Sequence, residues 1–346
     1  MSGVSRRPNI DPAAIFGPPL ADFQRLGLAV SGGPDSLALM LLAAEYAQSS
    51  GEGDRFVVYS VDHQLRSEAA GEVAFVVAEA TRLGLAARAL RWMGPKPATG
   101  IQEAAREARY RLFAAAMEHD KVDALVTAHH LGDQAETVLM RLAHGSGLEG
   151  LRGMDYLSEV GGLRIVRPLL GIDPEDLRAV VDAAGLTPVT DPSNSDLAYE
   201  RVRWRQMLPQ LAALGLDARR LGRFAQRVRE ADSALVNMAA QAMTLVEFAA
   251  GDTEAVIPRL TLMGLPRAIA VRVVGRVLDR VGGGQKPHAL AAVEALTARL
   301  ILEPVRTTLH GCLVRSGSRM VRFLREPGRG ERAKGPGRGG RSVTAY

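Results

Sequence analysis

The first half of the chain alternates short apolar runs with longer stretches whose apolar residues recur at helical spacing. The short runs lie at 26–30, 56–62, 86–92, 124–129 and 164–170. The longer stretches lie at 37–46, 68–83, 101–117, 133–143 and 173–185. Short apolar runs are typical of buried strands, and the longer pattern is typical of amphipathic helices. The alternation predicts an α/β fold with a doubly wound, mostly parallel sheet.

The pattern changes after about residue 208, where only helical spacing continues, at 217–247, 264–281 and 288–301. Two alternating segments, 306–315 and 319–325, on either side of Ser316-Gly317-Ser318 then indicate a β-hairpin. We therefore expect an N-terminal extension (1–23), an α/β domain (24–211), a smaller α-helical domain that ends in the hairpin (212–326) and a tail (327–346). The tail is rich in glycine and arginine, a composition typical of disorder.

Composition narrows the class of protein. The chain has 346 residues, 47% of them hydrophobic, which is enough for two domains with cores of their own. No apolar run is long enough to span a bilayer, and the first 17 residues lack the apolar stretch of a secretory signal. Cys312 is the only cysteine, which excludes an intramolecular disulfide and any paired-cysteine site. A cytoplasmic protein is expected.

The positive charge is unevenly distributed. The net charge is +5, and most of it comes from residues 327–346. The basic residues of this tail are Arg329, Arg332, Lys334, Arg338 and Arg341. The rest of the chain is close to neutral, so any basic surface on it must come from the arrangement of its charges.

The first predicted strand runs into Ser31-Gly32-Gly33-Pro34-Asp35-Ser36, directly before a predicted helix. Two glycines allow a sharp turn and a close approach to a ligand, and the start of a helix binds anions. The alternative interpretation is a structural turn in which Ser36 caps the helix. Neither a Walker sequence nor a dinucleotide-binding glycine pattern is present here.

The segment is similar to the signature loop of the PP-loop ATP pyrophosphatases, which cleave ATP between the α and β phosphates. The resemblance implies that the loop binds the pyrophosphate part of ATP through Ser31, Gly32, Gly33, Pro34, Asp35 and Ser36. A carboxylate among phosphates is repulsive unless a cation lies between them, so Asp35 is expected to help hold Mg²⁺.

Four further segments resemble the tRNA(Ile)-lysidine synthetases. They are Val61–Arg66, Ala105–Tyr110, Thr127–Thr137, and Asp191–Asn194 with Arg201–Arg203 downstream. The first and third follow predicted strands, where ligands bind in parallel sheets. In one respect the chain departs from the family, which usually has two adjacent aspartates after the paired histidines. Here the first of those positions is Gly132, and Asp133 keeps the second.

The resemblance implies a catalytic centre in which Arg109, His129 and Asp133 join Asp35. Arg109 would neutralise charge on the α-phosphate as pyrophosphate leaves. His129 would transfer a proton or hydrogen-bond a phosphate, and Asp133 would orient the incoming amine or bind a cation. His129 and Asp133 share one face if the helix has already begun at residue 129. Arg109 equally suits an ordinary ion pair on its own helix, and a structural role suits His129.

The reaction that the resemblance implies has two steps on one RNA. ATP adenylates the C2 oxygen of the wobble cytidine in the CAU anticodon of tRNA(Ile), and the amine of free L-lysine then displaces AMP to give lysidine. The alternatives are another PP-loop tRNA-modifying enzyme, such as a thiolase, and a non-catalytic nucleotide- or RNA-binding module. The single cysteine argues against the thiolase, and the intact loop argues against the module.

Overall fold

The computed structural model describes residues 10–97, 99–189, 196–283 and 289–326. The chain forms two compact units, residues 1–229 and 230–346, that divide inside a long helix. The tail at 327–346 and the Asp191–Asn194 segment lie outside the described residues. The domain limits expected from the sequence remain predictions.

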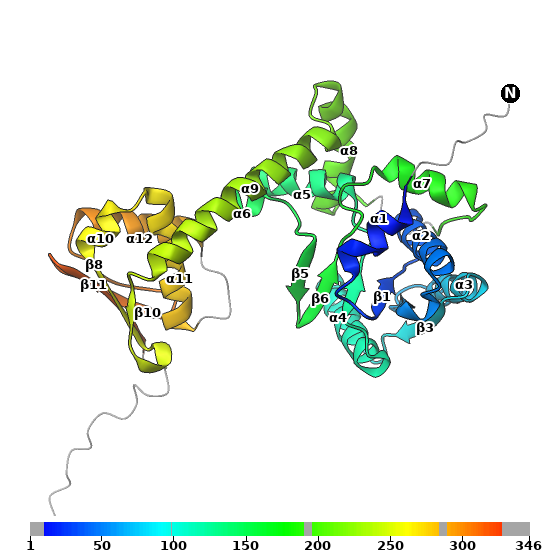
Figure 1. Ribbon diagram of the computed structural model, residues 1–346, viewed down its shortest axis with the longest axis horizontal. Helices are drawn as coiled ribbons and strands as arrows, with labels where there is room; N and C mark the ends of the chain where they lie inside the picture. The colour runs from blue at the N-terminus through cyan, green and yellow to red at the C-terminus, as the bar shows by residue number, and fades with distance from the viewer. Residues whose placement is uncertain (1–9, 98, 190–195, 284–288, 327–346) are drawn as a thin grey trace, which may run out of the picture. The chain divides into compact units, whose positions relative to one another are not determined.

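The first unit is built from strands and helices in alternation (Figure 1). Its elements are α1 (Pro12–Phe16), β1 (Leu26–Ala29), α2 (Pro34–Ser50), β2 (Phe56–Asp62), α3 (Ala69–Arg82), β3 (Ala86–Arg91), α4 (Ile101–Asp120), β4 (Ala124–Val126), α5 (Leu131–Ala143), α6 (Leu148–Leu151), β5 (Leu157–Val160), β6 (Leu163–Val166), α7 (Pro174–Ala183) and α8 (Glu200–Ala213). Short 3-10 turns lie at Pro18–Leu20 and Gly53–Arg55. Helix α9 (Ala218–Met243) follows and crosses into the second unit.

The strands form one six-stranded sheet in the order β3-β2-β1-β4-β6-β5. Every neighbouring pair is parallel except β5 with β6, so β5 is an antiparallel edge strand. From β1 the chain moves outward to β2 and β3, and then returns to place β4 on the other side of β1. The strand order therefore reverses at β1 and β4, and α/β sheets bind their ligands beyond the carboxyl ends of the strands at such a reversal.

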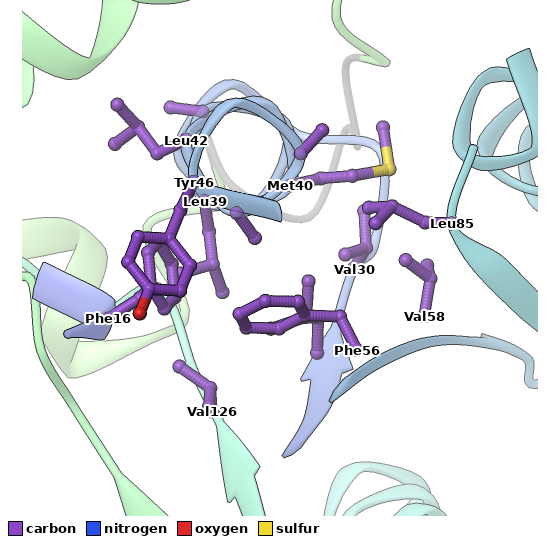
Figure 2. Close-up of a cluster of buried hydrophobic side chains, with 14 of the residues drawn as sticks. Phe16, Val30, Leu39, Met40, Leu42, Tyr46, Phe56, Val58, Leu85 and Val126 are labelled. Carbon is purple, nitrogen blue, oxygen red and sulfur yellow. The ribbon is translucent and has the colours of Figure 1, made fainter. Parts of the chain in front are cut away.

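Helices cover both faces of this sheet. The larger core packs β1, β2 and β4 against α1, α2, α3 and α7, while the opposite core packs Tyr59 and Leu125 against Phe113 of α4. Figure 2 shows side chains of α2, including Leu39 and Tyr46, gathered with Phe16 and Phe56 in the larger core. Phe16 and Phe56 meet edge to face with ring centroids 5.4 Å apart. Burying an aromatic side chain of this kind contributes about 2 to 3 kcal/mol.

The second unit combines helices with a separate antiparallel sheet. Its further elements are β7 (Glu247–Phe248), β8 (Glu254–Pro258), α10 (Arg259–Gly264), α11 (Arg267–Gly282), α12 (Leu290–Leu302), β9 (Arg306–Leu309), β10 (Cys312–Ser316) and β11 (Met320–Arg325), with a 3-10 turn at Ala250–Asp252. The strand order is β7-β8-β11-β10-β9. Alternate residues of β8, β10 and β11 pack with α11 and α12 into one core.

The structure confirms the mostly parallel α/β sheet and the helices that follow it. In the second unit the expected hairpin turn joins β10 and β11. The arm expected at 306–315 is not one strand but two, β9 and β10, which turn back on each other at His310-Gly311. These three strands belong to a five-stranded sheet with β7 and β8. Strands β7 and β8 lie between α9 and α11 in a stretch without a long apolar run, which is why the hydrophobic pattern did not reveal them.

Candidate active site

The loop after β1 takes a shape that depends on glycine. Gly32 has φ +86°, and a Cβ there would lie 2.9 Å from a methyl carbon of Val189. The Gly32 carbonyl accepts a hydrogen bond from the Val189 N–H at 2.9 Å. Helix α2 begins at Pro34 with Gly33 as its N-cap, and no side chain caps it. The first N–H groups of a helix have no partner inside the helix, so this end of α2 can receive an anion.

Ser36 braces this loop from within. Its hydroxyl donates to the Gly33 carbonyl at 3.0 Å and accepts from the Ser31 N–H at 3.1 Å. Ser36 is 8% exposed, whereas Ser31 is exposed. Ser36 therefore holds the loop in shape from the first turn of the helix and is not its N-cap. Of the two hydroxyls, that of Ser31 is the more accessible to a ligand.

The segment after β4 reaches the loop through His130. This residue is the N-cap of α5, and its Nδ1 accepts from the N–H groups of Gly132 at 3.0 Å and Asp133 at 3.3 Å. In return, Asp133 Oδ2 accepts from the His130 N–H at 3.0 Å, which completes a capping box. A Cβ on Gly132 would lie 2.9 Å from His130 Cε1. The glycine at this position therefore leaves room for the histidine ring.

The other ring nitrogen of His130 lies between two carboxylates. Nε2 is 3.5 Å from Asp35 Oδ2 and 3.6 Å from Asp133 Oδ2. Burial lowers the pKa of His130, but the hydrogen bond to Asp35 and the charge of Asp133 raise it above its ordinary value overall. Because Nδ1 accepts the cap, the neutral ring carries its proton on Nε2 and points it at Asp35 and Asp133. A second proton would have to go to Nδ1 and would disrupt the cap.

His129 sits just outside this contact. It precedes the N-cap, so it does not share a helical face with Asp133. Its Nδ1 lies 2.8 Å from Thr127 Oγ1. Burial lowers the pKa of His129 to about 4, with help from the charges of Arg167 and Arg201 and against the opposing effect of Asp133. At neutral pH His129 is therefore an uncharged imidazole that can hydrogen-bond or accept a proton, but cannot act as an imidazolium donor.

Two arginines of α8 converge on a buried glutamate of α5. Glu136 is 1% exposed. Its carboxylate lies 3.1 Å from Arg201 Nε and accepts from Arg205 Nε at 2.7 Å. Arg205 Nη2 also lies 3.7 Å from Asp133 Oδ1. The α5–α8 ion pairs thus continue directly into the Asp133 carboxylate, which completes the capping box of α5.

Arg109 lies on α4 and is half-buried. Burial lowers its pKa, and its guanidinium lies 5.9 Å from the ring centre of Tyr110. Among the described residues, no hydrogen bond or ion pair joins Arg109 to Asp35, His129 or Asp133. The structure therefore brings together Asp35 and Asp133, places His129 beside them, and leaves Arg109 as a separate, half-buried cation.

The segment after β2 forms a neighbouring turn. Asp62 is 5% exposed, and its Oδ1 accepts from the Gln64 N–H at 2.7 Å. Gln64 has φ +53°, a left-handed conformation that is costly for a residue other than glycine. His63 lies edge-on to Trp92, with ring centroids 6.2 Å apart. Backbone strain at the carboxyl edge of a sheet is typical of binding sites.

Sequence reasoning missed four residues of this cluster or gave them no role in it: His130, Glu136, Arg201 and Arg205. A usable signal existed for Glu136, which lies between Ala135, Thr137 and Val138 in an otherwise apolar helical run. A charge on the apolar face of a helix needs a buried partner. Arg201 and Arg205 are four residues apart and so present both cations from one face of α8.

The single thiol in the sequence, that of Cys312, lies in the second unit. Cys312 is fully buried, and its Sγ lies 3.5 Å from the Leu278 carbonyl. Burial raises the pKa of Cys312 to about 11. The thiol is therefore protonated at neutral pH and unreactive as a nucleophile.

This chain resembles known proteins both in sequence and in fold. The PP-loop domain family matches residues 10–211. The tRNA(Ile)-lysidine synthase of Bradyrhizobium sp. is 45% identical over 82% of this chain and 81% of its own length. That of Rhodopseudomonas palustris is 43% identical over 88% of this chain and 91% of its own length. The structure of a U34-tRNA thiolase from Methanococcus maripaludis with its 4Fe-4S cluster has a TM-score of 0.54 at 16% identity, covering 64% of this chain and 77% of that one.

At this low identity, the likeness to the thiolase structure is evidence for the fold and not for a shared activity. The strand order and the glycine turn into α2 define the first unit as a PP-loop, ATP-using domain. With relatives that match it over most of its length, the chain belongs to the tRNA(Ile)-lysidine synthase family and is an enzyme of that kind. Within the described residues, no helix is both long enough and apolar enough to cross a membrane.

Proposed function

We propose that this enzyme uses ATP to join L-lysine to C2 of the wobble cytidine in the CAU anticodon of tRNA(Ile). The observation that carries the proposal is the junction at His130, which links Asp35 of the phosphate loop to Asp133 of α5. This junction supports a shared role for the loop after β1 and the histidine–aspartate segment after β4, because their side chains meet there. The family membership supplies the substrate class.

The reaction balances in two steps. The cytidine C2 oxygen attacks the α-phosphorus of ATP. The bond between the α-phosphorus and the oxygen that bridges it to the β-phosphate breaks, and pyrophosphate leaves. The lysine amine then attacks C2, the C2–O bond breaks, AMP leaves, and the amine releases a proton. The α2 N-terminus and the exposed Ser31 hydroxyl would hold the departing pyrophosphate. The His130 Nε2–H would stay directed at Asp35 and Asp133 and would orient both carboxylates.

The donor set fits Mg²⁺. Within the described part of the chain, no three His, Cys, Asp or Glu side chains are grouped as a metal cage. Mg²⁺ does not need one, because it is usually bound by one or two carboxylates together with phosphate oxygens and water. The Asp35 side chain is 37% exposed, lies in the first turn of α2, and makes no tight hydrogen bond. When bound, the ion would neutralise the charge that develops on the phosphates, with Asp35 as its protein ligand.

Adenylate formation with labelled ATP tests this proposal. The enzyme is incubated with tRNA(Ile) alone and with lysine alone. Label on the RNA without lysine is the expected result, since the base is activated first. Mass spectrometry of the tRNA nucleosides after adding lysine should then show lysidine. A lysyl-adenylate formed without RNA would contradict the proposal, because the amino acid and not the base would then be the activated substrate.

A further inference from the structure

One face of the second unit's sheet points away from its core. The residues Ala255, Ile257, Cys312, Val314, Val321 and Phe323 are buried against the helices of that unit. Side chains alternate along a strand, so the residues between them belong to the opposite, outer face. On that face Leu313 and Leu324 are only half-buried, and Arg315 and Arg322 are exposed.

The register of the strands aligns three arginines across this outer face. Arg315 of β10 pairs with Arg306 of β9 on one side and with Arg322 of β11 on the other. Neighbouring strands are about 4.8 Å apart, so the row extends for about 10 Å. Like charges directly opposite each other destabilise a sheet. A row of three therefore has a cost that a folding role alone does not explain.

Little within the unit offsets these charges. Arg322 Nη1 lies 3.8 Å from Glu254 Oε1, a long contact to a half-exposed carboxylate. In the described part of the chain, Arg306 and Arg315 form no ion pair or side-chain hydrogen bond. All three side chains are exposed. The row is thus a set of guanidinium groups held at fixed spacing with donors to spare.

We propose that this outer face, through Arg306, Arg315 and Arg322, binds the phosphodiester backbone of the tRNA substrate; the inference rests on the proposed function. Guanidinium groups pair with phosphate oxygens in a planar, two-pronged geometry, which makes arginine the preferred residue for such contacts. A flat row of equal charges fits a ligand with regularly spaced charges. The adjacent Thr308 and Leu313 lie on the same face and would contact sugar rather than phosphate.

The test compares two triple variants of equal charge change. The row variant carries Arg306→Gln, Arg315→Gln and Arg322→Gln. The control carries Arg267→Gln, Arg276→Gln and Arg299→Gln on α11 and α12, which pack against the inner face. The dissociation constant for tRNA(Ile) is measured over a range of salt concentrations, and kcat and KM for tRNA are measured for lysidine formation.

The row variant should bind tRNA at least about tenfold more weakly near 0.1 M salt, and its salt dependence should fall by a slope of about 2, as expected for three lost phosphate contacts. Its KM for tRNA should rise while kcat stays within about twofold of wild type. Its melting temperature should be equal or higher, because like-charge pairs have been removed. Replacing all three arginines with lysine should restore most of the slope but not all of the affinity.

Three outcomes separate the possibilities. Equal weakening in the row variant and the control would mean that net charge alone matters, which overturns the proposal. Loss of binding to polyglutamate with tRNA affinity intact would identify an acidic protein as the occupant and also overturn it. If the wild-type enzyme forms neither an RNA adenylate nor lysidine, the proposed function itself fails, and this is seen before any variant is made.

Discussion

Two polar clusters lie toward opposite ends of the parallel sheet, and they are satisfied to very different degrees. Near the amino end of β4, Asp120 accepts from the Tyr59 hydroxyl at 3.0 Å and from Arg88 Nε at 2.6 Å. At the carboxyl end, His130 Nε2 stays 3.5 Å from Asp35 and 3.6 Å from Asp133. The first cluster is closed by short hydrogen bonds, and the second is held together by longer contacts.

The electrostatics differ in the same way. Burial raises the pKa of Asp120, but hydrogen bonds from Arg88, His119 and Tyr59 outweigh it and hold the pKa at about 2. Burial and the bond to Asp120 raise the pKa of Tyr59 well above its ordinary range. These groups are fixed in one protonation state. The difference teaches that a fully paired polar cluster stabilises a fold, whereas a cluster with unused capacity can bind and transform a ligand.

Among substitutions in the two clusters, the largest effect is expected at Asp35. Asp35→Asn should lower ATP cleavage by several orders of magnitude, because neutralisation of the phosphates by a held cation contributes several kcal/mol. The melting temperature should hardly change, since the Asp35 side chain is 37% exposed and makes no tight contact. Pyrophosphate release and thermal melting measure the two effects. Asp54→Asn, at an exposed aspartate in a 3-10 turn, is the control, and equal turnover in the two variants would remove the role given to Asp35.

The opposite result, a loss of stability without a loss of activity, is expected for the Asp120 cluster near the amino end of β4. Asp120→Asn should lower the free energy of unfolding by about 2 to 3 kcal/mol, because Arg88 and Tyr59 lose a buried acceptor. Below its melting temperature the variant should turn over normally. The carboxylate's pKa is depressed in the folded state, so its contribution is present above about pH 4 and is lost as the pH falls toward 2. Urea unfolding at pH 7 and pH 3 should show the wild-type advantage shrinking, and an advantage that grows toward acid pH would contradict this assignment.

His130 both stabilises the fold, as the N-cap of α5, and orients the carboxylates of the site. Two substitutions separate these roles. His130→Asn keeps an N-cap acceptor for α5 but removes the Nε2–H, so turnover should fall about 10- to 100-fold through misplacement of the carboxylates. His130→Ala should lose the same activity and in addition about 1 kcal/mol of unfolding free energy with the cap. Steady-state kinetics and urea unfolding measure the two losses. Unchanged turnover in His130→Asn would mean that the histidine acts only as the N-cap of α5.

The smallest effect is expected at Cys312, a buried polar group that belongs to neither cluster. Cys312→Ser should leave kcat and KM unchanged, because burial keeps the thiol protonated and no thiol chemistry is part of the reaction. A modest loss of stability, about 1 kcal/mol, is expected from a hydroxyl in an apolar core. Activity is measured by lysidine formation. A folded but inactive variant would return the thiolase interpretation to consideration.

Sequence reasoning located the central strands of the sheet, because strands that are buried on both faces read as continuous apolar runs. It also located β3, but that strand lies at the sheet edge with mostly exposed side chains, so the expectation that it is buried was wrong. It missed β5 (Leu157–Val160), whose Leu-Ser-Glu-Val sequence is half-exposed at the other edge. It listed no helix for α8, which carries Pro209 within it and buries only Val202 among its side chains. Edge strands and polar helices are specified largely by their neighbours in space, so the hydrophobic pattern along the chain is a weak guide to them.

The site was only partly accessible from the sequence for a similar reason. The phosphate loop is local, so its glycines and its position before a helix predicted its place. The contact between Asp35 and His130 joins residues 95 positions apart in sequence and depends on the register of β1 beside β4. Resemblance singled out His129, whereas the structure places the adjacent ring against the loop aspartate. Which of two neighbouring histidines points inward is decided by where α5 begins.

The missing side chain at Gly132 limits which residues this position can accept. A Cβ there would lie 2.9 Å from Cε1 and 3.1 Å from Nδ1 of the His130 ring, so a larger residue requires the ring to shift. Because Nδ1 accepts the N–H groups that begin α5 and Nε2 faces Asp35, such a shift would disturb the helix start and the carboxylates together. The mutational tolerance of position 132 is therefore coupled to the side chain at position 130.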